Sequence, residues 1–196
     1  MIKKILLSLI LFSFTTFAQN GEELLKNVQN KYKSIKDLIA DIQQTGSGNL
    51  SGKIAYKQGD LFRVELKNMT IISNGSTIWN FNKKDNKVII SNVDKTNPST
   101  FSLNTFLDDY PGKTNVAVEK SGDKNILTLT PKNNQSLNFN KIVLTVNKEN
   151  LVEKISVDKS SGTSTFTLSN YKVNQNLDDA KFNFIPPKGS NIVDLR

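Results

Sequence analysis

Histidine and cysteine are both absent from this chain of 196 residues. Their absence excludes Ser-His-Asp and Cys-His catalysis, disulfide bonds and the usual zinc ligand sets. An enzyme built on this sequence would have to use carboxylates, lysine, tyrosine or serine. The pairs Asp108-Asp109 and Asp178-Asp179 lack the spacing of a calcium-binding loop, and helix starts or solvated loops explain them better. We therefore expect no enzyme activity, no cofactor and no metal.

Arginine is also rare: Arg63 and Arg196 are the two arginines among the 26 basic residues. Bidentate recognition of phosphates or bases favours arginine, and the lysines are scattered rather than gathered in a block. The net charge of +8 therefore indicates a solvated surface with mild affinity for anionic lipid headgroups. We expect no nucleic-acid partner.

Long apolar runs occur only at the beginning of the chain. Lys3 and Lys4 precede an apolar run over residues 5–17, and Thr16 and Ala18 provide small residues before Gln19. This pattern predicts a secretory signal peptide over residues 1–18, with an uncleaved anchor as the alternative. Residues 19–196 are then expected to form a single exported domain.

Short alternating runs separated by turn residues fill most of the remaining sequence. One amphipathic helix is predicted over residues 21–35, with Asn20 as its cap. Strands are predicted over residues 38–45, 50–57, 61–67, 69–73, 76–82, 87–93, 115–120, 126–131, 141–147, 151–158 and 163–171. Many adjacent strands with short connections indicate an antiparallel meander, hence a sandwich or a barrel. A short helix or covering loop is expected over residues 97–111, and one helical turn over residues 177–181.

Two strands carry the aromatic residues of greatest interest. Phe62, Val64 and Leu66 alternate with charged residues, which indicates one apolar face that is either ordinary core or the lining of a cavity. Asn74-Gly75 predicts a hairpin in which Ile72 lies opposite Thr77. Ile72, Trp79 and Phe81 then share one face, while Ile71 and Ile78 share the other.

Three segments resemble the LolA family of outer-membrane lipoprotein carriers. Residues 56–65 (YKQGDLFRVE) resemble a strand–turn–strand segment that ends in F-R-W-E or a relative of it. Residues 72–82 (ISNGSTIWNFN) are similar to the pattern S-D-G-x-x-L-W-x-Y-x. Residues 180–189 (AKFNFIPPKG), followed by Val193-Asp194, resemble the ending A-x-x-F-x-F-x-P-P-x-G-x-x-V-x-D. Their order and spacing cover essentially the whole mature chain.

The resemblance implies a fold and a function. The fold is mainly β with helices (α+β): an incompletely closed, curved antiparallel barrel with an α-helical lid. The function is that of a periplasmic chaperone, monomeric and soluble. It takes acylated lipoproteins from an inner-membrane ABC exporter and carries their acyl chains in an apolar cavity to the outer membrane, where a receptor is a further candidate partner.

The resemblance also implies roles for individual residues. The acyl-chain cavity is expected to be lined by Phe62, Val64, Leu66, Ile72, Trp79 and Phe81. Where many family members have arginine-proline, with an arginine that holds the lid closed, this chain has Gln58-Gly59. Glutamine is an uncharged and weaker donor. The candidates for the lid or its closure are Gln58, Phe101, Leu103 and Phe106.

Three alternatives remain open on the sequence alone. A module of the same fold could bind another lipid or an apolar pigment, or it could act as a sensor of mislocalised lipoprotein. A carboxylate-dependent hydrolase is the third class, and the sequence offers few site residues for it.

Overall fold

The computed structural model describes residues 16–46, 48–93, 108, 110–133 and 137–196 of the chain. Helix α1 (Thr16–Ser34) is followed by β1 (Asp37–Gly46), β2 (Leu50–Lys57), β3 (Leu61–Leu66), β4 (Met69–Asn74), β5 (Thr77–Asn82) and β6 (Lys87–Asn92). A 3-10 turn η2 (Pro111–Lys113) leads into β7 (Thr114–Ser121), β8 (Lys124–Pro131), β9 (Lys141–Val146), β10 (Val152–Lys159) and β11 (Gly162–Val173). The chain ends with a second 3-10 turn, η3 (Asp179–Phe182), and β12 (Asn191–Asp194).

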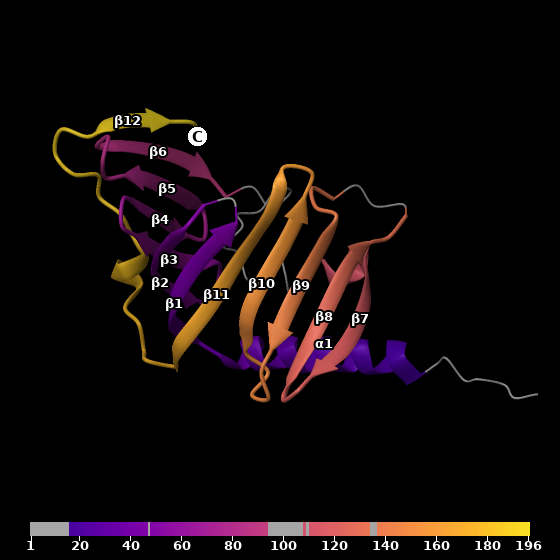
Figure 1. Cartoon of the computed structure of the whole chain (residues 1–196). Helices are drawn as coiled ribbons and strands as arrows, with labels where there is room; N and C mark the ends of the chain where they lie inside the picture. Colours follow the sequence, from indigo (N-terminus) through magenta and orange to yellow (C-terminus); the bar gives the residue numbers. More distant parts are fainter. Residues whose placement is uncertain (1–15, 47, 94–107, 109, 134–136) are drawn as a thin grey trace, which may run out of the picture.

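The twelve strands form one sheet in the order β12-β6-β5-β4-β3-β2-β1-β11-β10-β9-β8-β7. The sheet is strongly curved, and β12 and β7 remain as two separate edges (Figure 1). This confirms the predicted mainly-β fold built on an incompletely closed barrel. Within the described residues, no helix is long and apolar enough to cross a membrane.

Each strand predicted between residues 38 and 171 is present, with bounds that differ by at most two residues. β12 was not predicted, because a strand of four residues shows no alternation to detect. It joins the sheet through long-range bonds: the Asn191 amide donates to the Asn86 carbonyl at 2.9 Å and the Leu195 amide to the Ile90 carbonyl at 2.8 Å. The β12–β6 pair is parallel, so this edge differs from the antiparallel pairing of the rest of the sheet.

Helix α1 is the only α-helix that the described residues form. Its side chains Leu25, Val28 and Tyr32 are buried, as the amphipathic pattern predicts. The predicted cap at Asn20 is wrong, since the helix already begins at Thr16 and passes through that residue. Of the predicted covering segment, residues 97–107 and 109 lie outside the described residues.

The two faces of the sheet carry different clusters. We call the side against which α1 packs the inner face, and the opposite side the outer face. The inner cluster consists of buried side chains from α1, β1–β4 and β8–β11, together with Ile35, Phe139 and Leu151. A smaller set of buried side chains lies apart from that cluster: Ala55, Ile72, Val88, Ile90 and Phe182.

The last part of the chain, residues 174–196, is called the C-terminal arm. The buried Asp37 carboxylate holds its beginning by accepting bonds from the amides of Gln175 at 2.7 Å and Leu177 at 3.2 Å. The Lys57 ammonium donates to the Leu177 carbonyl at 2.8 Å. The predicted helical turn is present as η3, which Asp178 caps by accepting from the Ala180 amide at 2.9 Å.

Candidate functional site

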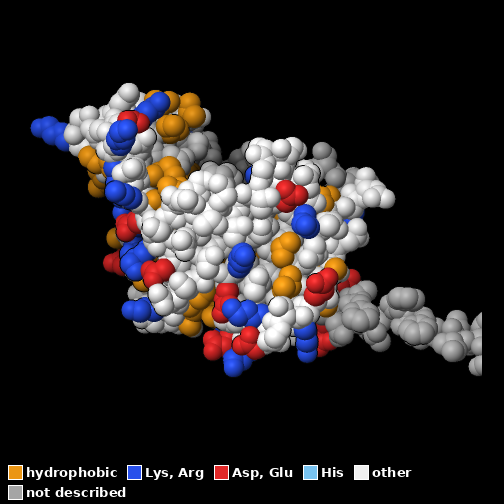
Figure 2. Space-filling view, in the orientation of Figure 1, with side chains coloured by type: hydrophobic (Ala, Val, Ile, Leu, Met, Phe, Trp, Pro, Cys, Tyr) orange, Lys and Arg blue, Asp and Glu red, His pale blue; other side chains and the backbone are white. Residues whose placement is uncertain are grey.

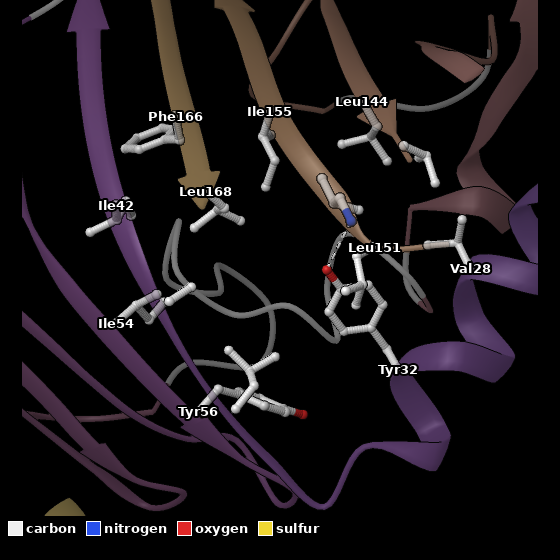
Figure 3. Close-up of a cluster of buried hydrophobic side chains, with 14 of the residues drawn as sticks. Val28, Tyr32, Ile42, Ile54, Tyr56, Leu144, Leu151, Ile155, Phe166 and Leu168 are labelled. Carbon is white, nitrogen blue, oxygen red and sulfur yellow. Dashed lines mark hydrogen bonds between the residues drawn. The ribbon is translucent and has the colours of Figure 1, made fainter. Parts of the chain in front are cut away.

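The inner cluster is the largest apolar region of the described residues. Figure 3 shows its side chains converging from opposite parts of the curved sheet and from α1 toward a common interior. Figure 3 labels Val28 and Tyr32 of α1, Ile42, Ile54, Tyr56, Leu144, Ile155, Phe166 and Leu168 of the sheet, and Leu151. No group of three or more acidic residues able to hold a metal ion occurs among the described residues. Among the described residues, this interior is therefore built from hydrophobic side chains and not from charged groups.

Tyr32 connects α1 to the sheet from within the inner cluster. Its hydroxyl accepts a hydrogen bond from the Val152 amide at 3.1 Å, as the dashed line in Figure 3 marks. The Tyr171 hydroxyl donates to the carbonyl of the same Val152. Burial raises the pKa of both Tyr32 and Tyr171, so both hydroxyls stay protonated and keep these bonds at any physiological pH.

Gln58, predicted as a closure residue, contacts the C-terminal end of α1. Its side-chain Nε2 donates to the Lys33 carbonyl at 2.8 Å, and its backbone amide donates to the Lys36 carbonyl at 3.0 Å. An ion pair of 3.2 Å joins Lys33 to Asp108. The β2–β3 turn is therefore bonded to the helix end. The other closure candidates, Phe101, Leu103 and Phe106, lie outside the described residues.

The six residues expected to line one cavity are divided between the two faces. Phe62, Val64 and Leu66 are buried in the inner cluster, where a cavity lining would have to be. Ile72 lies opposite Arg63, and directly opposed residues of antiparallel strands share a face. Ile72 and its face neighbours Trp79 and Phe81 therefore belong to the outer face, and placing them with Val64 was wrong.

The β4–β5 hairpin explains this error. The expected grouping of Ile72, Trp79 and Phe81 on one face is confirmed, although Ile72 lies opposite Trp79 instead of Thr77. The turn is centred on Gly75, whose φ is +87°, and the Asn74 side chain accepts bonds from the amides of Ser76 and Thr77 at 3.1 and 2.9 Å. Both strands are apolar on both faces, so alternation alone does not tell which face is inside.

The outer face of β3, β4 and β5 is covered by the C-terminal arm. Its turn η3 packs against β3 and β4 and places Phe182 in a fully buried position. The Phe184 ring lies 5.5 Å from the Phe81 ring between centroids. The Arg63 guanidinium also donates to the Lys181 carbonyl at 3.4 Å. Sequence reasoning missed this second cluster, although the spacing of Phe182 and Phe184 matches that of Trp79 and Phe81.

Comparison with known proteins gives a consistent result. The family model described as "Outer membrane lipoprotein carrier protein LolA" matches residues 35–185. The outer-membrane lipoprotein carrier proteins of Francisella philomiragia and Pasteurella multocida are each 30% identical, covering 98% and 100% of this chain and 97% of their own length. An uncharacterized conserved protein from Thermus thermophilus is similar in structure, with a TM-score of 0.61 at 18% identity, over 90% of this chain and 99% of that protein. This last likeness concerns the fold alone.

Proposed function

Because this chain belongs to the LolA family of outer-membrane lipoprotein carriers, we propose that it shelters the acyl chains of lipoproteins against its inner face. The family is a non-enzymatic transport family, and membership implies a periplasmic protein that binds lipoproteins. In the proposed cycle, an inner-membrane ABC exporter loads the carrier and the acylated lipoprotein is delivered to the outer membrane. A receptor there is a candidate partner.

The observation that supports this proposal is an apolar inner face against which helix α1 packs through Leu25, Val28 and Tyr32. Burial of each CH₂ group is worth ~0.8 kcal/mol, so a ~16-carbon acyl chain gains ~13 kcal/mol in an apolar site. The hydrogen bond between the Val152 amide and Tyr32 contributes ~0.5–1.5 kcal/mol, and so does the bond between the Gln58 side chain and the Lys33 carbonyl. Relative to an acyl chain in water, cargo burial is therefore large enough to offset the loss of these bonds and of part of the packing of α1, if α1 moves to admit the cargo.

The proposed processing of the chain follows the sequence prediction. Residues 1–18 would be removed on export and residues 19–196 would act as one carrier domain. Mass spectrometry of the protein purified from the periplasm tests this, since a mass that includes residues 1–18 would contradict the cleavage.

The test of the carrier function is what the purified protein binds. Organic extraction of protein from the periplasm, followed by mass spectrometry, should yield acylated lipoprotein, and the protein should release lipoproteins from inner-membrane vesicles. If neither occurs, the carrier proposal is wrong. A different lipid in the extract would favour the alternative of a LolA-like binding module with another ligand.

The proposed opening of α1 can be tested separately, because the chain contains no cysteine of its own. A short thiol cross-linker between Lys33→Cys and Gln58→Cys should block lipoprotein uptake, and cleavage of the cross-linker should restore it. The control joins Asp41→Cys to Lys53→Cys, which replace a 2.6 Å ion pair between the adjacent strands β1 and β2. Equal uptake by both cross-linked proteins would show that α1 does not need to move.

A further inference from the structure

Exposed hydrophobic side chains gather in the C-terminal arm. Among the described residues, Ile185, Ile192 and Leu195 are 89%, 50% and 65% exposed, and the only other large hydrophobic side chain in this class is Leu50 at 40%. Figure 2 shows hydrophobic side chains at the end of the molecule where β12 and β6 lie, with Lys and Arg side chains beside them. Single exposed hydrophobic residues are normal, but a group of them marks an interaction surface.

This end of the arm is fixed to the sheet and is not a loose tail. β12 pairs with β6 so that Ile192 lies next to Val88. Asn86 accepts a bond from the Ser190 hydroxyl at 2.9 Å and donates one to the Gly189 carbonyl at 3.1 Å. Ile192 is therefore held near the β5–β6 turn, which contains residues 83–86, and Leu195 lies farther along the same edge, where its amide donates to the Ile90 carbonyl at 2.8 Å.

Basic residues outnumber acidic ones at this end, where the exposed Asp85 of the β5–β6 turn accepts a hydrogen bond from Asn82 at 2.6 Å. Lys84 and Lys188 are exposed and Lys87 is half-buried, and none of them takes part in an ion pair that the described residues form. The Asp194 carboxylate is paired with Arg196 at 2.7 Å. We call this surface the C-terminal patch: Lys84, Lys87, Ile185, Lys188, Ile192 and Leu195.

We propose that the C-terminal patch docks the protein on an anionic lipid surface. Lysines near such a surface are attracted by its negative potential, and neighbouring apolar side chains enter the headgroup region. Ile185 and Leu195 project with little protein around them. A fluid headgroup layer can accommodate such side chains without the matching shape that a protein partner would need. This docking goes beyond the carrier function, because it requires no cargo.

Vesicle flotation tests the proposal directly. The exported protein is mixed at low ionic strength with vesicles of phosphatidylcholine alone or of phosphatidylcholine with phosphatidylglycerol. We expect binding to the anionic vesicles only, and weaker binding as salt is added. Lys84→Gln with Lys188→Gln should weaken binding about five-fold for each lysine removed. Ile192→Ser with Leu195→Ser should weaken it as well, with unchanged thermal stability.

Two control variants are available elsewhere on the molecule. Leu50→Ser removes the remaining exposed large hydrophobic side chain of the described residues, and Lys120→Gln removes a lysine from β7 at the other edge of the sheet. Both should bind like the unaltered protein. Equal losses in control and patch variants, or no preference for anionic vesicles, would overturn the proposal. Capture of an acidic protein without vesicle binding would also overturn it. Because no lipoprotein is present, such a failure would leave the carrier function untouched.

Discussion

Replacing Tyr32 with phenylalanine should release helix α1 from the sheet while leaving the shape of the inner cluster almost unchanged. The substitution removes only the hydroxyl, whose partner is the amide of the buried Val152 at 3.1 Å. An amide left without a partner in such a place costs ~1–3 kcal/mol. A value of ~2 kcal/mol changes the equilibrium between attached and released helix about 30-fold.

The consequence for binding follows if α1 must move before an acyl chain enters. The apparent affinity then rises in proportion to the fraction of molecules with α1 released, up to the same factor of about 30. A fluorescent fatty-acyl probe measures this affinity, and amide hydrogen exchange reports the release of α1 itself. The midpoint of thermal unfolding should fall by ~4–8 °C, at ~2–4 °C for each kcal/mol in a chain of this length.

A matched control separates release of the helix from general loss of stability. Val157→Ala removes two methyl groups from the inner cluster, at ~0.8 kcal/mol each plus the cost of the cavity. Val157 lies on β10, opposite Ile142 and Ser164. The Val157→Ala substitution should lower the midpoint of thermal unfolding by a similar amount, without faster amide hydrogen exchange in α1. If Tyr32→Phe resembles this control in both exchange and probe affinity, the idea that Tyr32 holds a movable helix is refuted.

Three further predictions concern the arm, its last ion pair and the helix end. Phe182→Ala should cost ~3–5 kcal/mol of stability yet leave probe affinity unchanged in the folded protein, and a large loss of affinity would contradict the separation of the two faces. Arg196 lowers the pKa of Asp194 from 3.8 to about 2, so stabilisation of β12 should be complete above pH 4 and lost towards pH 2. Hydrogen exchange of β12 measures this, and Asp194→Asn should remove the pH dependence. Gln58→Arg should slow probe uptake, because a charged donor bonds more strongly to the carbonyls at a helix end; faster uptake would contradict it.

Most of the sheet could be predicted because its signals are local. Turn residues such as Gly59-Asp60 and Asn74-Gly75 divide the sequence into runs of strand length, and these turns exist with positive φ at Asp60, Gly59 and Gly75. Neighbouring runs joined by short turns pair with one another. By contrast, β12 pairs with β6, a strand about a hundred residues earlier, and its four residues do not indicate with which strand it pairs.

The candidate site was only half predictable for a related reason. Alternation groups side chains into faces, and it correctly separated Ile72 and Trp79 from Ile71 and Ile78. It does not say which group faces the main core when both are apolar. That choice depends on what covers each face, and the cover of the outer face is supplied by Phe182 and Phe184 from the far end of the chain.

Strands β4 to β6 have apolar side chains on both faces, which raises the question of which side opens to cargo. The C-terminal arm is attached to the sheet at its beginning by the buried Asp37 and at its end by the pairing of β12 with β6. Phe182 between them is fully buried, so lifting the arm would expose an aromatic side chain and leave a buried carboxylate without its donors. Helix α1 is attached by the buried side chains Leu25 and Val28, by the bond of Tyr32 to the Val152 amide, and at its end by the Gln58 side chain and the Lys33–Asp108 ion pair. Since fewer polar groups lose their partners when α1 moves, we propose that the inner face is the side that opens to cargo.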